Sequence, residues 1–379
     1  MATIMTKKIA TNIGNAVKKA ATNANPNPHM AAASRAIADR IPLVDFLVEI
    51  RDARAPSSSG YELLRKLPSS AARPTRIIVM NKADLADPSQ SKEWMSQFEQ
   101  QNCLCYSMNS HNKENVKQFL NFLQAQVREL QRADRSSHTT TVMLVGIPNV
   151  GKSALASSLH QIGRISAAEK GKLKHATVSP HPGETKDISS LKIGSHPNIY
   201  VLDTPGILPL KTLDVEVCSK LALTGAISDS LVDVKELAGY FLAILNSGDK
   251  YKKWEKLCSY DDGKAFMEHK AEHSSGSELV EKPKRQYPTD HTQDFIVRDV
   301  RRSLFETISY FEGKLEDDQD LTKLIKSQFI ALMKLFRIAG ELDGDGFSKV
   351  ACKLLNLYRT GRLGRYTLDP VSRDTCHLC

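Results

Sequence analysis

The chain has 379 residues, of which 41% are hydrophobic and 25% are charged, and this length predicts two or three domains. The composition excludes a wholly disordered chain, and no apolar run approaches the roughly 18 residues of a membrane-spanning helix, so no stable membrane insertion is expected. Seven cysteines form an odd and sparse set, which argues against a disulfide scaffold. The net charge of +9 suits contact with a polyanion without requiring one.

The N-terminal segment is basic and contains no acidic residue before Asp39. Ile9, Ile13 and Val17 recur at four-residue spacing between lysines, which predicts a basic amphipathic helix. Residues 1–33 are therefore expected to be a mitochondrial targeting segment, with the protein in the matrix, with or without inner-membrane association. A disordered basic arm and the first helix of the fold are the alternatives, and a chloroplast or cytoplasmic location stays open.

From residue 34 onward, apolar segments of strand length alternate with helical patterns. Strands are expected at 43–50, 76–80, 103–106, 141–145 and 198–202, with helices at 61–67, 93–100, 116–130, 150–160, 295–311, 321–339 and 349–359. Such alternation is typical of a mostly parallel sheet covered by helices. We expect an α/β domain at 34–245, a polar linker or insertion at 246–294 and a small all-α domain at 295–379.

The strongest motif is the segment Gly146–Ser153, which reads G-I-P-N-V-G-K-S after a predicted strand. Its glycines let backbone N–H groups surround phosphate oxygens, and the helix that follows adds the positive end of its dipole. Lys152 supplies a positive charge to the β and γ phosphates, and Ser153 supplies a hydroxyl to Mg²⁺. The loop residues expected to contact a nucleotide are Asn149, Val150, Gly151, Lys152, Ser153 and Ala154.

Two further motifs also follow predicted strands. Asp203 begins D-T-P-G, where the carboxylate can hold Mg²⁺ and the N–H of Gly206 can meet a γ-phosphate. Asp84 ends N-K-A-D, and its carboxylate can accept both N1–H and N2–H₂ of guanine, a donor pair that adenine lacks. Asn81 and Lys82 are expected to brace the neighbouring loops. The three motifs together predict binding of GTP and GDP, with Mg²⁺ as cofactor.

The order of these motifs is unusual, because the guanine motif precedes the phosphate loop. The same sheet can form if the old termini are joined and new ones opened, so the chain resembles the circularly permuted GTPases. Arg51–Pro56 (R-D-A-R-A-P) and residues 358–368 (Y-R-T-G-R-L-G-R-Y-T-L) resemble the D-A-R and closing signatures of the ribosome-assembly members. Over about residues 28–370 the chain is similar to bacterial ribosome biogenesis GTPase A and the mitochondrial ribosome-associated GTPases. The basic N-terminus suggests a eukaryotic organellar member, a DAR GTPase.

The resemblance implies a circularly permuted P-loop GTPase domain followed by helices that contact rRNA, and a role in maturing the large ribosomal subunit. It implies that Ser107 begins a second base-contacting loop and that Thr185 is the switch I threonine that ligates Mg²⁺. A monomer with slow intrinsic hydrolysis, raised by a ribosomal partner, is expected. Residues 349–365 hold basic residues and no acid, which predicts either an rRNA-facing helix or a solvated helix face.

The catalytic group is less evident, because Ile207 stands where a glutamine would orient the attacking water. His29, in Pro28-His29-Met30, matches a histidine of the family's G-H-M segment, with proline in place of glycine. Asn149 matches a position that holds K⁺ in cation-dependent GTPases, where K⁺ could offset transition-state charge, or it only caps the loop. The candidate catalytic residues are His29, Lys152, Thr185 and Gly206. The alternative function is a guanine-nucleotide-gated RNA- or protein-binding scaffold with little hydrolysis.

Overall fold

The computed structural model describes residues 4–23, 28–65, 74–101, 103–134, 139–169, 188–258, 291–338 and 344–371. By its internal contacts the chain divides into two compact units. One contains Gly14–Val232 with Arg365–Cys379, and the other contains Met1–Ile13 with Asp233–Gly364. Thr185, the expected switch I threonine, lies outside the described residues.

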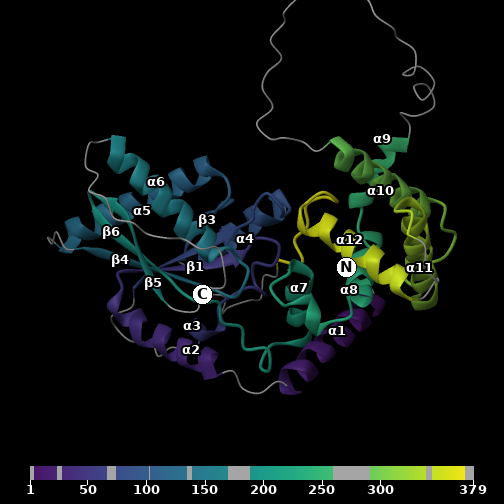
Figure 1. Cartoon of the computed structure of the whole chain (residues 1–379), viewed down its shortest axis with the longest axis horizontal. Helices are drawn as coiled ribbons and strands as arrows, with labels where there is room; N and C mark the ends of the chain where they lie inside the picture. Colours follow the sequence, from purple (N-terminus) through teal and green to yellow (C-terminus); the bar gives the residue numbers. More distant parts are fainter. Residues whose placement is uncertain are drawn as a thin grey trace, which may run out of the picture. The chain divides into compact units, whose positions relative to one another are not determined.

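The first unit contains a six-stranded sheet in the order β3-β2-β1-β4-β6-β5 (Figure 1). The strands are β1 (Phe46–Asp52), β2 (Thr75–Asn81), β3 (Leu104–Ser107), β4 (Thr140–Val145), β5 (Ser189–Ser195) and β6 (Asn198–Asp203). All neighbours pair in parallel except β5, which is antiparallel to β6. The predicted mostly parallel sheet is confirmed.

Two details of the sheet differ from the prediction. The first strand begins at Phe46 because Ile41–Leu43, which includes a proline, forms a short 3-10 helix (η1). The edge strand β5 has no counterpart among the predicted strands. Of its residues only Ile193 is buried, so its sequence carries little of the apolar pattern that marks the central strands.

Helices cover both faces of this sheet. They are α2 (Pro28–Arg40), α3 (Glu62–Arg65), α4 (Pro88–Gln100), α5 (Lys113–Asp134), α6 (Lys152–Glu169) and α7 (Val215–Thr224). Helices α5 and α6 lie on one side, and α2 and α3 lie on the other (Figure 1). Helix α4 begins where the Asp87 side chain accepts backbone N–H bonds and Pro88 occupies the first turn. Its Trp94 and Phe98 are buried in the core beside β2.

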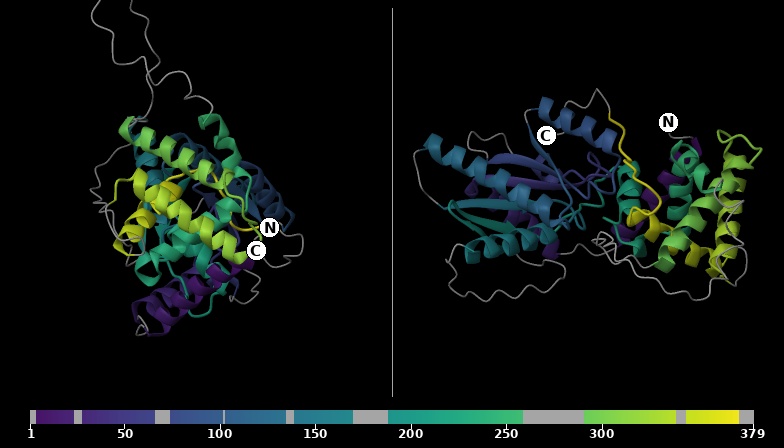
Figure 2. Two further views of the ribbon diagram at one scale, coloured as in Figure 1. Left: turned by 90° about the vertical axis from the view of Figure 1, so that its right-hand side faces the viewer. Right: turned by 90° about the horizontal axis from the view of Figure 1, so that it is seen from above.

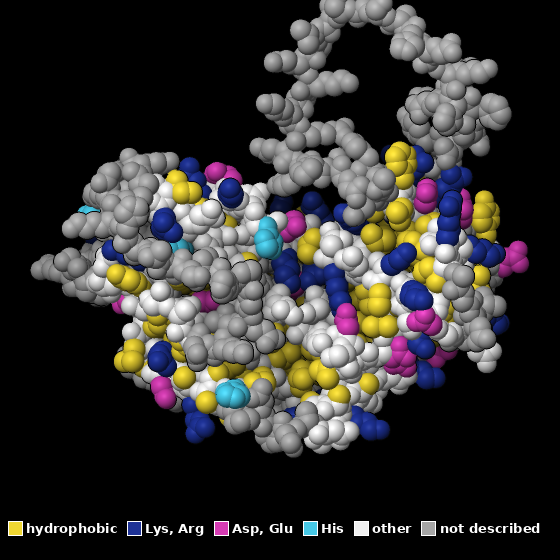
Figure 3. Space-filling view, in the orientation of Figure 1, with side chains coloured by type: hydrophobic (Ala, Val, Ile, Leu, Met, Phe, Trp, Pro, Cys, Tyr) yellow, Lys and Arg dark blue, Asp and Glu magenta, His cyan; other side chains and the backbone are white. Residues whose placement is uncertain are grey.

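The second unit is helical in its described part. Its elements are α8 (Val234–Asn246), η3 (Lys250–Trp254), α9 (Glu255–Cys258), α10 (His291–Ser309), α11 (Asp318–Leu335) and α12 (Asp345–Arg359) (Figure 2). Buried amides of Asn246 and Gln328 exchange two hydrogen bonds of 3.1 and 2.8 Å between α8 and α11. Lys and Arg are interspersed with Asp and Glu over these helices (Figure 3). The short helices η3 and α9 lie within the expected polar linker, so residues 250–258 of that linker are helical.

Among the described residues, no helix combines the length and the hydropathy that a membrane span requires. Cys105, Cys218 and Cys352 are free thiols.

The N-terminal segment forms a regular helix, α1 (Ile4–Asn23), as its periodicity predicts. Ile13 and Val17 are fully buried, so the helix packs its apolar side inside the protein. Gly14 lies so close to α7 that an added Cβ would stand 2.3 Å from the carbonyl oxygen of Val215. This contact favours the reading of α1 as the first helix of the fold, and a role in targeting stays a prediction.

Replacing Gly14 with valine is expected to lower the melting temperature by several degrees, because the new side chain must displace the α7 backbone. Overpacking of this kind costs about 1–3 kcal/mol. Differential scanning fluorimetry of the full chain measures the effect, and Asn15→Val, at an exposed position of the same helix, is the control. Equal melting temperatures for Gly14→Val and the wild type would contradict a packed α1.

Candidate functional site

Five loops meet at one edge of the sheet, because β1, β2, β3, β4 and β6 run parallel and end on the same side. The phosphate loop follows β4, the D-T-P-G segment follows β6 and the N-K-A-D motif begins at the end of β2. The D-A-R turn follows β1. The chain order of the strands reverses between β1 and β4, and this is the position at which open α/β sheets bind ligands.

The phosphate loop has the backbone geometry that its glycines suggested. Gly146 and Gly151 have φ values of +151° and +101°, and Asn149 has a φ of +59°. A Cβ on Gly151 would lie 2.3 Å from Nδ2 of Asn81, so only glycine fits there. Val150 is buried, and Ser153 and Ala154 lie in the first turn of α6. The loop therefore presents backbone N–H groups at a helix N-terminus, as a phosphate cradle requires.

Lys152 is the buried cation of this loop, with 6% of its surface exposed. Its Nζ donates a 2.7 Å hydrogen bond to the carbonyl oxygen of Ile147, within the same loop. Burial lowers the pKa of Lys152 to about 8, although the negative charge of Asp203 opposes that shift. Because burial makes the Lys152 ammonium costly to keep charged, a polyphosphate bound beside it would stabilise that charge.

The D-T-P-G segment lies against the phosphate loop. Asp203 ends β6 opposite Leu144 of β4 and is 4% exposed. A Cβ on Gly206 would come within 2.7 Å of Pro148 and 3.0 Å of Lys152 Nζ. Asp203 ends β6 and Ser153 opens the helix after the neighbouring strand β4, so a carboxylate and a hydroxyl stand at adjacent strand ends. Oxygen donors of this kind are the ligands that Mg²⁺ prefers.

The guanine motif is tied to the phosphate loop through Asn81, which is 1% exposed. Its Nδ2 donates to the carbonyl oxygen of Val150 at 2.8 Å and to Oγ of Ser110 at 3.1 Å. The backbone N–H of Ser110 donates in return to Oδ1 of Asn81 at 2.9 Å. Ser110 was absent from the predicted site. Its position just after β3, in the loop expected to contact the base, was the only available signal.

Lys82 and Asp84 differ in their surroundings. Lys82 has a φ of +59°, and its Nζ donates to the carbonyl oxygen of Asn149 at 2.7 Å. Asp84 is exposed in the loop after β2, at the side of the sheet where the parallel strands end. Ser107 ends β3, and the Met108 that follows exchanges backbone hydrogen bonds with the residues around Asn81.

The structure thus brings most of the predicted residues to one edge of the sheet. The residues found there are Asn81, Lys82, Asp84, Ser107, Asn149, Val150, Gly151, Lys152, Ser153, Ala154, Asp203 and Gly206. His29 lies exposed in the first turn of α2.

The D-A-R turn contacts the C-terminal segment, and the sequence motifs did not predict this contact. The Asp369 carboxylate accepts backbone N–H bonds of 2.9 and 2.8 Å from Ser57 and Ser58 and pairs with Lys220 of α7 at 3.2 Å. The backbone N–H of Leu368 donates to the carbonyl oxygen of Arg54 at 2.7 Å. The last residue of the closing signature therefore contacts the D-A-R turn, and Asp369 directly after it contacts the residues that follow that turn and α7.

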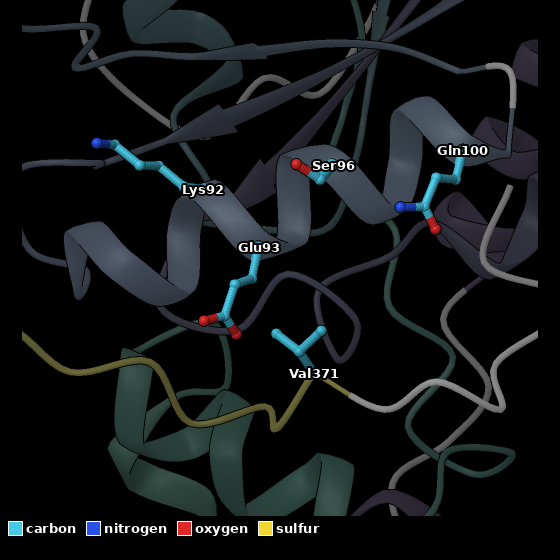
Figure 4. Close-up of a pocket in the computed structure, with 5 residues that line it drawn as sticks. All are labelled: Lys92, Glu93, Ser96, Gln100 and Val371. Atoms are coloured by element: carbon cyan, nitrogen blue, oxygen red, sulfur yellow. The ribbon is translucent and has the colours of Figure 1, made fainter.

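A groove between α4 and the same C-terminal segment is shown in Figure 4. Its lining residues are Lys92, Glu93, Ser96, Gln100 and Val371. None of them belongs to the loops at the carboxyl edge of the sheet, so the groove is distinct from the candidate site.

Comparison with known proteins identifies the family. Residues 141–264 match the family model described as 50S ribosome-binding GTPase. The chain is 61% identical over 375 residues to DAR GTPase 2, mitochondrial, from Arabidopsis thaliana, covering 98% of each protein. This chain belongs to the DAR GTPase family. It is also 30% identical to ribosome biogenesis GTPase A of Bacillus pumilus, over 74% of this chain and 95% of that protein.

Among solved structures, one titled as the GDP-bound form of TM YlqF matches 88% of the DAR GTPase chain and 98% of its own, with 18% identity and a TM-score of 0.41. The circular permutation is visible in this chain itself, because β1 and β2, with the guanine motif, precede β4 and the phosphate loop in sequence.

Proposed function

We propose that this DAR GTPase binds and hydrolyses GTP as an assembly factor for the large subunit of the mitochondrial ribosome. The observation that carries the GTPase assignment is the bond network of Asn81, which joins the guanine motif to the phosphate loop. The ribosomal assignment draws on the matched family description and on the relative named for ribosome biogenesis. The mitochondrial assignment draws on the relative with 61% identity.

In the proposed reaction, water attacks the γ-phosphorus, the bond to the β–γ bridging oxygen breaks, and GDP and phosphate leave. Lys152 and the loop N–H groups bind the phosphates, and the N–H of Gly206 meets the γ-phosphate. Ser153, Thr185 and Asp203 would hold Mg²⁺, which neutralises phosphate charge when bound. Asp84 selects guanine, and Ser107 lies beside the base.

The group that assists water attack is part of this proposal. Ile207, 8% exposed, cannot hydrogen-bond a water as glutamine would. His29 is one candidate, and a K⁺ ion held by the side-chain oxygen of Asn149 is the other. With neither in place, intrinsic hydrolysis is slow, and a ribosomal partner raises it.

The proposed domain arrangement has the permuted GTPase at 34–245, a linker or insertion at 246–294 and an rRNA-contacting helical domain at 295–379. On α12 Lys349 and Lys353 are exposed while the apolar side is buried, which is the distribution that contact with a polyanion needs. We propose a monomer in the matrix, with residues 1–33 acting in targeting.

Sedimentation of the tagged full chain from purified mitochondria tests this function. With a non-hydrolysable GTP analogue the protein is expected to migrate with the large subunit, and with GDP it is expected at the top of the gradient. Migration at the top in both states would remove the ribosome from the proposal and leave the nucleotide site in place.

A non-hydrolysing scaffold is the second candidate function, and Ile207 is the observation that favours it. Single-turnover hydrolysis with and without large-subunit precursors separates the two. Acceleration by the precursor, in K⁺ but not in Na⁺ buffer, is expected for the assembly GTPase. No turnover in any condition would leave the scaffold.

A further inference from the structure

Two buried ion clusters lie three residues apart on β1 and are built alike. Glu49 pairs with Arg51 and Arg76, and Asp52 pairs with Arg54 and Lys82. In each cluster the carboxylate and the arginine two residues later have at most 3% of their side chains exposed. The second cation comes from β2 or its loop and is 21% or 23% exposed.

Both carboxylates are charged at neutral pH. Burial alone would raise their pKa values, but the paired cations hold the pKa of each well below its ordinary range. The two clusters therefore bury charges of the same kind in the same arrangement. They differ in which segments of the protein their side chains contact.

The Glu49 cluster stays among structural neighbours. Arg51 donates to the carbonyl oxygen of Pro56 at 3.1 Å, and the backbone N–H of Tyr61 donates to Glu49 at 2.7 Å. Neither neighbour belongs to a proposed nucleotide loop.

The Asp52 cluster reaches two loops of the proposed site. The Lys82 ammonium lies 3.0 Å from Asp52 Oδ2 and donates to the phosphate-loop carbonyl of Asn149. Arg54 donates one hydrogen bond to each carboxylate oxygen of Asp52, at 2.9 and 2.7 Å. The same guanidinium donates to the carbonyl oxygen of Thr224, the last residue of α7, at 2.9 Å.

A last hydrogen bond closes these contacts into a ring. Nδ2 of Asn149 donates at 2.9 Å to the carbonyl oxygen of Gly225, which caps α7 with a φ of +82°. The guanine motif, the phosphate loop and the C-terminal end of α7 are therefore joined through one carboxylate. Helix α7 is also the first helix after the D-T-P-G segment, so a nucleotide-dependent change there has a direct route to it.

We propose that Asp52 and Arg54, the acidic and the basic residue of the D-A-R motif, are positioning residues for guanine-nucleotide binding. Asp52 holds the Lys82 ammonium against the phosphate loop, and Arg54 transmits the state of that loop to the end of α7. This inference rests on the proposed nucleotide site and names residues that do not themselves touch the nucleotide.

The test compares paired substitutions in the full-length protein. The double variant Asp52→Asn with Arg54→Gln removes both buried charges together, which avoids leaving either one uncompensated. Glu49→Gln with Arg51→Gln is the matched control. Titration with mant-GDP, a fluorescent GDP analogue, is expected to give a Kd about tenfold or more weaker for the first variant, the size of one charge-assisted hydrogen bond. The control Kd should lie within twofold of the wild type.

Hydrogen exchange supplies a readout that a purely structural role would not move. In the wild type, GDP is expected to raise the protection of the backbone amides of residues 224–227, at the end of α7. Arg54→Met keeps the Asp52–Lys82 pair and is expected to lose that GDP-dependent protection. This single variant also serves if the double variant does not fold.

The outcomes separate the inference from the function beneath it. A wild type that does not bind mant-GDP would overturn the proposed nucleotide site and the inference together. A wild type that binds, with unchanged affinity in Asp52→Asn/Arg54→Gln or unchanged protection in Arg54→Met, would overturn the inference alone.

Discussion

Replacing Lys152 with methionine is expected to lower GTP hydrolysis by about 10²–10³-fold or more, the cost of removing one preorganised charge from a phosphoryl-transfer site. Methionine keeps most of the volume of this buried side chain and removes only the ammonium. Single-turnover hydrolysis at saturating GTP measures the effect, and a mant-GDP titration separates lost binding from lost chemistry. Lys192→Met, at an exposed position on β5, is the control.

The pH dependence gives a second test of the same side chain. The pKa of Lys152 is about 8 in the ligand-free protein, because burial disfavours the ammonium. Bound phosphates raise that pKa again, so binding takes up a proton wherever the free amine is partly neutral. Affinity should therefore be greatest below pH 8 and fall as the pH rises through 8. Calorimetry in buffers of different ionisation enthalpy should show that the wild type takes up about half a proton more at pH 8 than Lys152→Met does.

Two results would contradict this assignment. Hydrolysis by Lys152→Met within fivefold of the wild type would show that the phosphates bind elsewhere. Proton uptake at pH 8 that persists in the methionine variant would show that another group titrates.

The motif-bearing loops could be predicted from the sequence because local chemistry determines them. Gly146 and Gly151 adopt positive φ values in a strand–loop–helix segment, and a parallel sheet brings the ends of its strands together. The central strand β2 was equally predictable, since burial on both faces makes Ile77–Met80 a continuous apolar run.

The contacts between distant segments could not be predicted from the sequence. Nothing in the segment around Asp369 indicates that its carboxylate binds the backbone of Ser57 and Ser58, because that contact joins opposite ends of the chain. Ser110 was missed for a related reason, since it meets Asn81 only after β2 and β3 pair. In α1, the packing of Gly14 on Val215 cannot be read from a periodicity that also fits a targeting helix.

Asp84→Asn is expected to reverse the base preference of the site. The carboxylate accepts N1–H and N2–H₂ of guanine, and asparagine would instead direct its N–H₂ group at the guanine N2–H₂ donor. Two charge-assisted hydrogen bonds are lost or weakened, which should lower GDP affinity by about 10²–10³-fold. Xanthine carries an oxygen in place of N2–H₂, so it accepts from the asparagine amide and should bind the variant more tightly than GDP does.

Competition of GDP and xanthosine diphosphate for the mant-nucleotide complex measures this reversal. Asp87→Asn is the control, because Asp87 follows the same loop but caps α4, and asparagine caps helices equally well. Asp84 is exposed, so its substitution should leave the melting temperature unchanged and any change in preference reflects recognition of the base. If Asp84→Asn still prefers GDP, base selection would have to come from the loop after β3, where Ser107 and Ser110 are the residues to replace next.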